Sequence, residues 1–293
     1  MTEKTQIYWS LNDYCESRCF YCPSTFWNGD KPRDIEQYKS ITSKIIEHYL
    51  SLDRHVDWYF NGGEPLDFSD FTSLLKICKE NGGNIDLTTN GGKIWLDWFA
   101  IEPYIDNLHL SFHYWQNYNL IKFIIQTFLN SKKQIEIFVP IRNTAFDDDI
   151  SRAKQIQEEF WIPVTKQILY YNADSRHGMF HYTEKQLRIL EGLDPYDETE
   201  SSLIQDSRFF KDTTHAEKIV HIVKNNPSYT GKICNAGIEK LYISPQGWVK
   251  GSECNDRPLG NIWKDSFRLP VEGHPCGMTV CFFDNDQKIT KFT

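Results

Sequence analysis

Three cysteines near the beginning of the chain, Cys15, Cys19 and Cys22, are spaced closely enough to bind one metal cluster together. The apolar run 7–12 before them predicts a strand, so they follow its carboxyl end on a loop. Three thiolates can bind three irons of a four-iron, four-sulfur cluster and leave the fourth iron open for a small ligand. A zinc knuckle is the alternative, but zinc takes four ligands and no fourth lies nearby in the sequence. The spacing therefore favours an open iron-sulfur site.

Four more cysteines, Cys234, Cys254, Cys276 and Cys281, lie toward the other end of the chain. Four thiolates would close the coordination shell of one cluster, which suits electron transfer better than direct binding of a substrate. A zinc site built from the same four is the alternative. The eighth cysteine, Cys78, falls on the apolar stripe of a predicted helix, so we expect it in the core and not in a hydrogen-donating role.

The composition argues against two broad classes of function. A formal net charge of −8, without any run of Lys and Arg, argues against binding to a nucleic-acid backbone. The N-terminus is too polar for a signal peptide, and the longest apolar stretch, 121–129, is short and interrupted by Lys122 and Gln126. We therefore expect a cytoplasmic protein without membrane contacts, whose cysteines bind metal and do not form disulfides.

The first two thirds of the chain alternate between strand-like and helix-like segments, a pattern that predicts repeated βα units and a parallel sheet. Six strands are expected, at residues 7–12, 56–61, 85–89, 108–112, 135–141 and 164–169. The helices expected between them cover residues 35–49, 71–78, 95–104, 118–130 and 148–160. Six right-handed units predict an α/β fold, a partial (β/α)6 TIM-like barrel, with ligands bound at the carboxyl ends of its strands.

The alternation stops near residue 170, and we expect three regions: a barrel at 1–170, a helical bridge at 171–232 and a small C-terminal domain at 233–293. In the bridge, Thr183 and Gln186 predict a capping box at the start of one helix. An apolar stripe at 216–223 predicts another helix. In the last region, residues 241–248 predict a hairpin that turns at 245–247.

Two motifs carry a resemblance to a known family. The run Cys15-Glu16-Ser17-Arg18-Cys19-Phe20-Tyr21-Cys22 matches the Cys-x3-Cys-x-aromatic-Cys signature of the radical S-adenosylmethionine superfamily. The second strand ends in Asn61-Gly62-Gly63-Glu64-Pro65, which resembles the Gly-Gly-Glu-Pro motif that receives the methionine amino group in that superfamily. Glycines let a backbone approach a ligand closely, and a carboxylate pairs with an ammonium. The resemblance covers about residues 5 to 170.

The resemblance also implies which other residues contact the cofactor. Tyr21 is expected near the adenine, and the backbone around Leu169 is expected to complete that pocket. Polar residues at the ends of the third and fourth strands resemble the contacts to the ribose and to the methionine part: Thr89, Asn90, Ser111 and His113. Arg142, after the fifth strand, is expected to pair with the methionine carboxylate or with the substrate, or to lie solvated on the surface.

The C-terminal region resembles the auxiliary-cluster region of twitch and SPASM radical enzymes. The matching segments are Cys234-Asn235-Ala236-Gly237, residues 241–249 before Cys254, and Leu259-Gly260-Asn261-Ile262. Four cysteines without surplus suggest one auxiliary four-iron cluster, the twitch version, and so two clusters in all. Two departures stand out: only four residues separate Cys276 from Cys281, and the stretch leading to Cys254 is expanded.

The resemblance implies reductive cleavage of S-adenosylmethionine to a 5′-deoxyadenosyl radical, which removes hydrogen from a substrate C–H bond, with a flavodoxin- or ferredoxin-type electron donor. No residue is assigned to catalysis on the substrate itself. The first expected strand starts close to the N-terminus, so we expect no leader-peptide domain before it. We therefore expect oxidation or epimerisation of a sugar-like or other small polar metabolite. Maturation of a ribosomally made peptide, activation of a glycyl-radical enzyme, and a non-enzymatic zinc-binding interaction protein are the alternatives.

Overall fold

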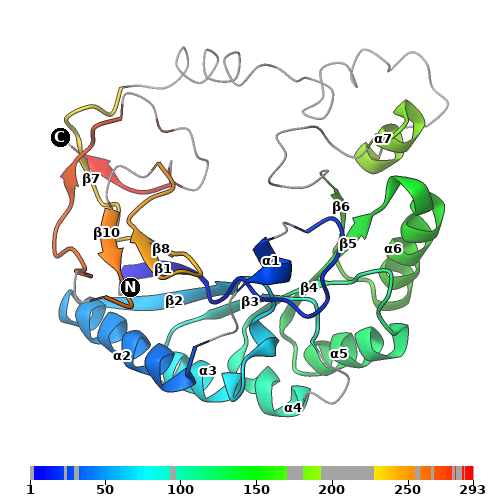
Figure 1. Cartoon of the computed structure of the whole chain (residues 1–293), viewed down its shortest axis with the longest axis horizontal. Helices are drawn as coiled ribbons and strands as arrows, with labels where there is room; N and C mark the ends of the chain where they lie inside the picture. Colours follow the sequence, from blue (N-terminus) through cyan, green and yellow to red (C-terminus); the bar gives the residue numbers. More distant parts are fainter. Residues whose placement is uncertain are drawn as a thin grey trace.

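A parallel sheet with helices along one face forms the body of the molecule (Figure 1). The structure, a computed structural model, describes residues 3–22, 25–29, 33–92, 97–169, 181–192, 228–254, 258–264, 267–278, 281, 286 and 288–292. The parallel strands are β1 (Glu3–Ser10), β2 (Arg54–Asn61), β3 (Ile85–Thr89), β4 (Asn107–Ser111), β5 (Gln134–Ile141) and β6 (Val164–Ile168). The helices are α1 (Thr25–Asn28), α2 (Ile35–Ser51), α3 (Phe71–Glu80), α4 (Trp98–Ile101), α5 (Tyr118–Asn130) and α6 (Phe146–Phe160). Short 3-10 turns are η1 (Pro65–Asp67), η2 (Glu102–Tyr104) and η3 (Asn143–Ala145).

Strands β1 to β6 lie in sequence order and pair in parallel, which confirms the predicted α/β partial barrel. The sheet stays open, because among the described residues its two edge strands, β6 and β10 (Pro258–Asn261), do not pair with each other. Each parallel connection between neighbours carries a helix, as such pairs require. The carboxyl ends of all six strands therefore meet at one rim of the barrel.

The core lies between the sheet and the helices α2 to α6. Alternate residues of each strand face it, so on β1 the side chains of Ile7 and Trp9 are fully buried while Tyr8 and Ser10 face the other, concave side. Trp58 and Phe60 of β2 stack against each other on the helical side at 5.6 Å. The concave face thus carries polar and aromatic side chains, and this face is where a ligand can lie.

The C-terminal segment continues the same sheet. Strand β8 (Lys240–Ile243) pairs in parallel with β1, and β9 (Trp248–Lys250) and β10 extend it in antiparallel fashion. A separate three-stranded sheet joins β7 (Ile233–Cys234), β11 (His274–Pro275) and β12 (Lys291–Phe292). The predicted hairpin at 241–248 is confirmed as β8 and β9, but it adds strands to the barrel sheet. The residue ranges expected for three regions stay a prediction.

Most predicted helices are confirmed, with shifts at their ends. Helix α7 (Glu184–Glu191) begins with the expected capping box, in which the Thr183 and Gln186 side chains bond to each other's backbone N–H. Helix α4 is shorter than expected and continues as η2, and α6 begins two residues earlier than expected. Residues 216–223 lie outside the described residues. Cys78 is buried in the core, as expected. No described helix has both the length and the apolar character needed to cross a bilayer.

Candidate functional site

A cavity of about 310 Å³, here called the strand-end cavity, lies at the carboxyl ends of the parallel strands. Nearly all residues expected to bind the first cluster and its cofactor line it: Cys15, Cys19, Tyr21, Cys22, Gly62, Gly63, Glu64, Thr89, Asn90, Ser111, His113 and Leu169. These residues come from four strand ends and from the segment after β6. The parallel topology therefore gathers at one place what the sequence separates by up to about half of the chain.

The loop that carries the three cysteines folds tightly over the rim. The backbone N–H of Cys22 donates to the carbonyl of Cys19 at 2.9 Å, and that of Cys15 donates to the carbonyl of Phe26 at 3.1 Å. Arg18 adopts a φ of 44°, in the left-handed region that few residues other than glycine enter. This turn brings the cysteines to one wall of the cavity, so the fold itself constrains their spacing.

The Cys19 thiol is the most readily ionised of the three. A hydrogen bond from Cys22 is the main cause that lowers the pKa of Cys19, and contacts to His113 and Trp115 add to it. The indole N–H of Trp115 donates to Cys19 Sγ at 3.4 Å, while His113 Nδ1 lies 3.9 Å from the same sulfur. Burial raises the pKa of Cys15. Because the thiolate is the form of cysteine that binds metals, the lowered pKa would favour metal binding at Cys19.

Glu64 presents a buried carboxylate to the cavity, with 2% of its surface exposed. Its oxygens accept hydrogen bonds from Thr89 Oγ1 at 2.6 Å, from the Asn90 N–H at 2.8 Å and from the Leu66 N–H at 2.9 Å. Burial raises the pKa of Glu64 to about 7. Within the part of the chain that the structure describes, no ion pair includes Glu64, so its position suits the ammonium of an incoming ligand.

The two glycines before Glu64 are required by the loop that carries the cysteines. A Cβ on Gly63 would lie 2.0 Å from the carbonyl oxygen of Tyr14, and a Cβ on Gly62, where φ is +145°, would lie 2.6 Å from that of Asn12. The Gly63 N–H donates to the Asn12 carbonyl at 2.8 Å. We expected the glycines to make room for a ligand; the structure shows that they let the end of β2 pack against the cysteine loop.

An aromatic group surrounds His113 beside the cysteines. Its ring lies between those of Tyr21 and Trp115, with centroids 5.8 and 5.7 Å away and nearly parallel planes. Tyr21 Oη lies 2.5 Å from His113 Nδ1. Leu169 packs with Cys19 and Tyr21 in a small buried cluster. These contacts fix one side of the cavity with flat, apolar surfaces, the kind of surface on which an adenine ring stacks.

Two expected cofactor residues lie elsewhere. Arg142 does not line the cavity: its guanidinium bonds Asp149 at 2.9 and 2.7 Å and lies 4.0 Å from the Tyr114 ring centroid. Pro65 is buried and begins the 3-10 turn η1, also outside the lining. Contact of these two with a cofactor stays a prediction, and for Arg142 the structure gives a specific alternative partner.

The sequence did not identify several residues that the structure places in or beside this cavity. Those that line it are Arg18, Phe26, Asn61, Pro140 and Gln167. Thr88 and Ile168 also line it, and they belong to segments that the sequence had already placed at the pocket. Asn61 follows the buried Phe60 at the end of β2, and that alternation was the available signal for it. No such signal marked Gln167, because the neighbouring residues of β6 are only partly buried. Nothing in the sequence distinguished Trp115, because a loop tryptophan more often packs than bonds to a sulfur.

All four late cysteines line a second, smaller cavity, here called the four-cysteine pocket. Cys234 lies on β7, Cys276 directly after β11 and Cys254 after β9, so separate segments bring them together. The empty space measures only about 10 Å³. Across the described residues, no three His, Cys, Asp or Glu side chains are arranged to hold a single metal ion.

The wall of this pocket connects to the concave face of the barrel. Asp286, 1% exposed, accepts from the Cys254 N–H at 2.9 Å and from Tyr242 Oη at 3.4 Å. Tyr242 stacks on Tyr8 at 5.1 Å, and Tyr8 stacks on Tyr59 at 4.4 Å. Three tyrosines in a row thus join neighbouring strands between the middle of the barrel and the four-cysteine pocket.

Comparisons with known proteins add to this geometry. No known family model matches the chain. A stretch of 100 residues is 31% identical to 7-carboxy-7-deazaguanine synthase of Bacillus cereus, covering 33% of this chain and 40% of that protein. The chain therefore spans well under half the length of this curated relative.

Solved structures match over 90% of the chain. The structure of polyhistidine-tagged anSMEcpe with bound AdoMet matches with a TM-score of 0.50, 13% identity and 79% of its own chain covered. Streptococcus suis SuiB bound to S-adenosylmethionine matches with a TM-score of 0.51 at 14% identity, and SuiB bound to the precursor peptide SuiA with 0.54 at 16%. The chain spans 64% of the length of SuiB. This protein therefore has the mostly parallel α/β fold that is also seen in these S-adenosylmethionine-bound structures.

Proposed function

We propose that this protein is a radical S-adenosylmethionine enzyme. Cys15, Cys19 and Cys22 would hold a four-iron, four-sulfur cluster with one open iron, and the strand-end cavity would take S-adenosylmethionine. When bound and reduced by a flavodoxin- or ferredoxin-type donor, this pair supplies a 5′-deoxyadenosyl radical. The protein would then direct that radical to one C–H bond of a substrate.

One observation carries the proposal: three closely spaced thiols and a buried carboxylate without an ion-pair partner among the described residues line the same cavity. A structural zinc site would need a fourth ligand. His113, 3.9 Å from Cys19, is already close to Tyr21. The Glu64 carboxylate is already held by hydrogen bonds from Thr89, Asn90 and Leu66. A sulfonium cofactor with an ammonium group explains both features.

The chain's own residues would bind and orient the cofactor. Glu64, held by Thr89 and Asn90, would receive the ammonium, and the flat group of Tyr21 and His113 would face the adenine. Asn90 Nδ2 lies 3.6 Å from Cys15 Sγ, so the residue that holds Glu64 also contacts the cysteine loop. This contact would couple cofactor binding to the position of the cluster.

The four-cysteine pocket would hold a second, auxiliary cluster of the twitch type. Four buried or half-buried thiols around one cavity support this, and Asp286 would orient Cys254 by accepting its backbone N–H. A closed shell of four thiolates suits an electron acceptor for a substrate radical, which favours oxidation over epimerisation.

We place a sugar-like or other small polar metabolite first as the substrate, because the concave face is lined by polar and phenolic side chains. One finding favours a second candidate, maturation of a ribosomally made peptide: the chain matches the structure of SuiB bound to the precursor peptide SuiA. A radical enzyme acting on peptides would be consistent with that likeness.

The proposal is tested by anaerobic reconstitution of the full chain with iron and sulfide, followed by reduction in the presence of S-adenosylmethionine. We expect about eight irons and a similar amount of acid-labile sulfide per chain if both clusters form. We also expect release of 5′-deoxyadenosine. Stoichiometric zinc without labile sulfide, and no 5′-deoxyadenosine, would instead identify a zinc-binding interaction protein.

A further inference from the structure

Two side chains at the strand ends donate hydrogen bonds to sulfurs of the first cysteine set. The indole Nε1–H of Trp115, on the turn after β4, donates to Cys19 Sγ at 3.4 Å. The side-chain amide of Asn90, directly after β3, donates to Cys15 Sγ at 3.6 Å and also to Ser17 Oγ at 3.2 Å. The barrel therefore places N–H donors against two of the three thiols expected to hold the first cluster, and the donor from Trp115 is the nearer one.

The turn that carries Trp115 is fixed by hydrogen bonds and by stacking. The Trp115 ring stacks on that of His113, with centroids 5.7 Å apart and an angle of 6° between the planes. Gln116 Oε1 accepts from the His113 N–H at 2.6 Å, and the Gln116 N–H donates to the His113 carbonyl at 3.1 Å. The turn is thus closed on both sides of the indole, which holds its N–H group in one direction.

Gln116 also connects the two donors to each other. Its Nε2 donates to the carbonyl oxygen of Asn90, while its Oε1 holds the turn of Trp115. The Gln116 side chain is buried. One buried amide therefore ties the end of β3 to the turn after β4, so both N–H groups are positioned by the same residue.

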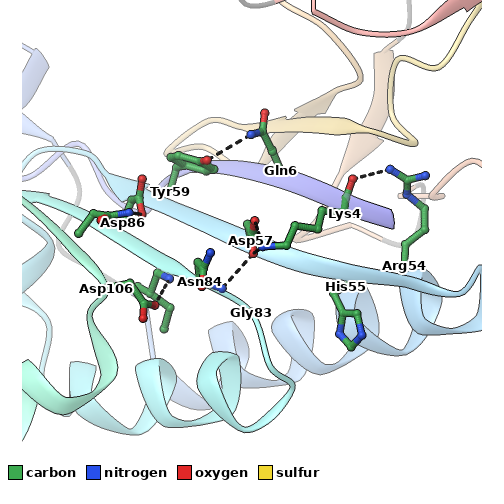
Figure 2. Close-up of polar contacts among 12 residues, drawn as sticks. Lys4, Gln6, Arg54, His55, Asp57, Tyr59, Gly83, Asn84, Asp86 and Asp106 are labelled. Atoms are coloured by element: carbon green, nitrogen blue, oxygen red, sulfur yellow. Dashed lines mark hydrogen bonds and ion pairs between the residues drawn. The ribbon is translucent and has the colours of Figure 1, made fainter. Parts of the chain in front are cut away.

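The polar contacts among β1, β2 and β3 differ in their acceptors (Figure 2). Lys4 Nζ donates to the Asp57 carboxylate at 2.9 Å, and this carboxylate also accepts from a backbone N–H. Gln6 Nε2 donates to Tyr59 Oη at 3.2 Å. In each of these contacts the acceptor is an oxygen, and the contact joins neighbouring segments of the sheet. The two bonds at the strand ends differ because their acceptors are sulfurs of expected cluster ligands.

A hydrogen bond to a ligating sulfur is one of the features that set the reduction potential of an iron-sulfur cluster. One electron from the flavodoxin- or ferredoxin-type donor adds one negative charge to the cluster, and an N–H group directed at a ligand sulfur stabilises that added charge. The indole nitrogen of Trp115 can only donate. Its effect therefore has one sign: it raises the potential and makes reduction easier.

We propose that Trp115, oriented by Gln116, raises the reduction potential of the first cluster through its hydrogen bond to Cys19 Sγ, with a weaker contribution from Asn90 through Cys15 Sγ. The inference rests on the proposed function for the presence of the cluster. It adds that the ends of β3 and β4, and not the cysteine loop alone, determine how strong a reductant the enzyme needs. Trp115 is a positioning residue in this role, because it acts through the ligand sulfur.

The test measures the midpoint potential of the first cluster in the full chain after anaerobic reconstitution with iron and sulfide. A redox titration is followed by electron paramagnetic resonance, and the signal that changes on adding S-adenosylmethionine identifies the first cluster. Trp115→Phe keeps an aromatic ring beside His113 and removes the N–H donor. We expect the equilibrium constant for reduction to fall about tenfold, the order of one hydrogen bond, which lowers the potential by about 59 mV for a one-electron couple.

A matched control and a second measurement keep the test decisive. Trp161→Phe removes an indole N–H from a side chain that is 90% exposed, and it should leave the potential unchanged. The second measurement uses the unmodified chain labelled with ¹⁵N in the indole of tryptophan. Pulsed electron paramagnetic resonance of the reduced cluster should show a ¹⁵N coupling that persists in Trp161→Phe and is lost in Trp115→Phe. This coupling reports the bond directly, so it decides even if Trp115→Phe takes up no iron.

The other outcomes separate this inference from the proposed function. An unchanged potential in Trp115→Phe, or the absence of a ¹⁵N coupling in the labelled unmodified chain, would reject the role of Trp115 and leave the enzyme assignment standing. An equal fall in Trp161→Phe would also reject it, because the effect would not depend on the bond to Cys19. If the unmodified chain binds neither iron nor sulfide, both proposals fail. None of these measurements needs the substrate or release of 5′-deoxyadenosine.

Discussion

The strand-end cavity and the four-cysteine pocket both collect thiols, but they are built differently. The first set comes from one loop of eight residues, held by backbone hydrogen bonds and by the end of β2. The second set comes from separate segments and closes on a cavity of about 10 Å³. Local chain geometry therefore fixes the first site, whereas the second depends on long-range packing and on whatever it binds.

The two sites also differ in how readily their cysteine thiols ionise. Hydrogen bonds lower the pKa of Cys19, so one thiolate is available at neutral pH without metal. Burial raises the pKa of Cys234 and raises that of Cys281 to about 11, although the Lys291 ammonium partly opposes this in both. The thiols of Cys234 and Cys281 would therefore ionise mainly when a metal displaces their protons.

Substitution of Cys19 is the most direct test of the difference between the two sites. We expect Cys19→Ala to abolish release of 5′-deoxyadenosine, because the first cluster would lose one of its three iron ligands. The circular dichroism spectrum should stay close to that of the unmodified chain. Cys78→Ala, which removes a buried thiol from the core, is the matched control and should retain cleavage. Full cleavage activity in Cys19→Ala would remove the first site from the mechanism.

A second test separates the roles of the two sites. Cys254→Ala should reduce bound iron by about half, since one of two four-iron clusters would be lost. Release of 5′-deoxyadenosine should persist, because no described residue of the four-cysteine pocket lines the strand-end cavity. Product formation should fall sharply once a substrate is known. An unchanged iron content would show that Cys254 is not needed to hold a cluster in this pocket.

The smallest expected effect concerns Glu64 and pH. Because burial raises the pKa of Glu64 to about 7, the carboxylate is ionised only above that pH, and affinity for S-adenosylmethionine should rise as pH increases from 6 to 8. Glu64→Gln should weaken binding about tenfold at pH 8 and flatten the pH profile. Equilibrium dialysis with labelled cofactor measures both. A pH profile shared by both proteins would contradict the assigned role.

The raised pKa of Glu64 also makes the stability of the protein depend on pH. A carboxyl whose folded pKa lies above its unfolded value holds more protons in the native state between those values. The contribution of Glu64 to the free energy of unfolding therefore falls as pH rises from about 4.5 to about 7 in the absence of cofactor. An ammonium bound beside Glu64 would offset that loss, so added S-adenosylmethionine should raise the melting temperature more at pH 8 than at pH 6.

Much of the barrel could be predicted because its buried strands carry apolar residues in short runs bounded by polar ones. Where a strand boundary differs from the prediction, polar residues on the concave face are the reason. Strand β1 starts at Glu3, earlier than expected, because Lys4 and Gln6 point to the polar side and interrupt the apolar pattern. Helix α6 starts at Phe146, and residues 147–149 in its first turn are acidic, as suits the positive end of a helix.

Within the site, the sequence allowed residues adjacent to a motif to be placed at the cavity, but it did not reveal long-range contacts. Glu64, Asn90 and His113 line the cavity because each follows a strand end, and parallel strands bring their carboxyl ends together. Arg142 pairs with Asp149, seven residues further along the chain at the start of α6, and this ion pair competes with the expected contact to a ligand. The bond from Trp115 to Cys19 joins residues 96 positions apart, and no local pattern signals it.

The sequence by itself determined three features: the spacing of three cysteines, the Gly-Gly-Glu-Pro turn, and the alternation of strands and helices that gives a parallel sheet. These are local features, set by backbone geometry and by the period of buried side chains. Only the tertiary structure decided that the late hairpin joins the barrel sheet and that three tyrosines from three strands stack in a row. It also decided that Asp57 and Asp106 have Lys4 and Lys79 as counter-ions. These contacts depend on which strands become neighbours in the sheet. They join groups that are distant along the chain, so no local sequence pattern predicts them.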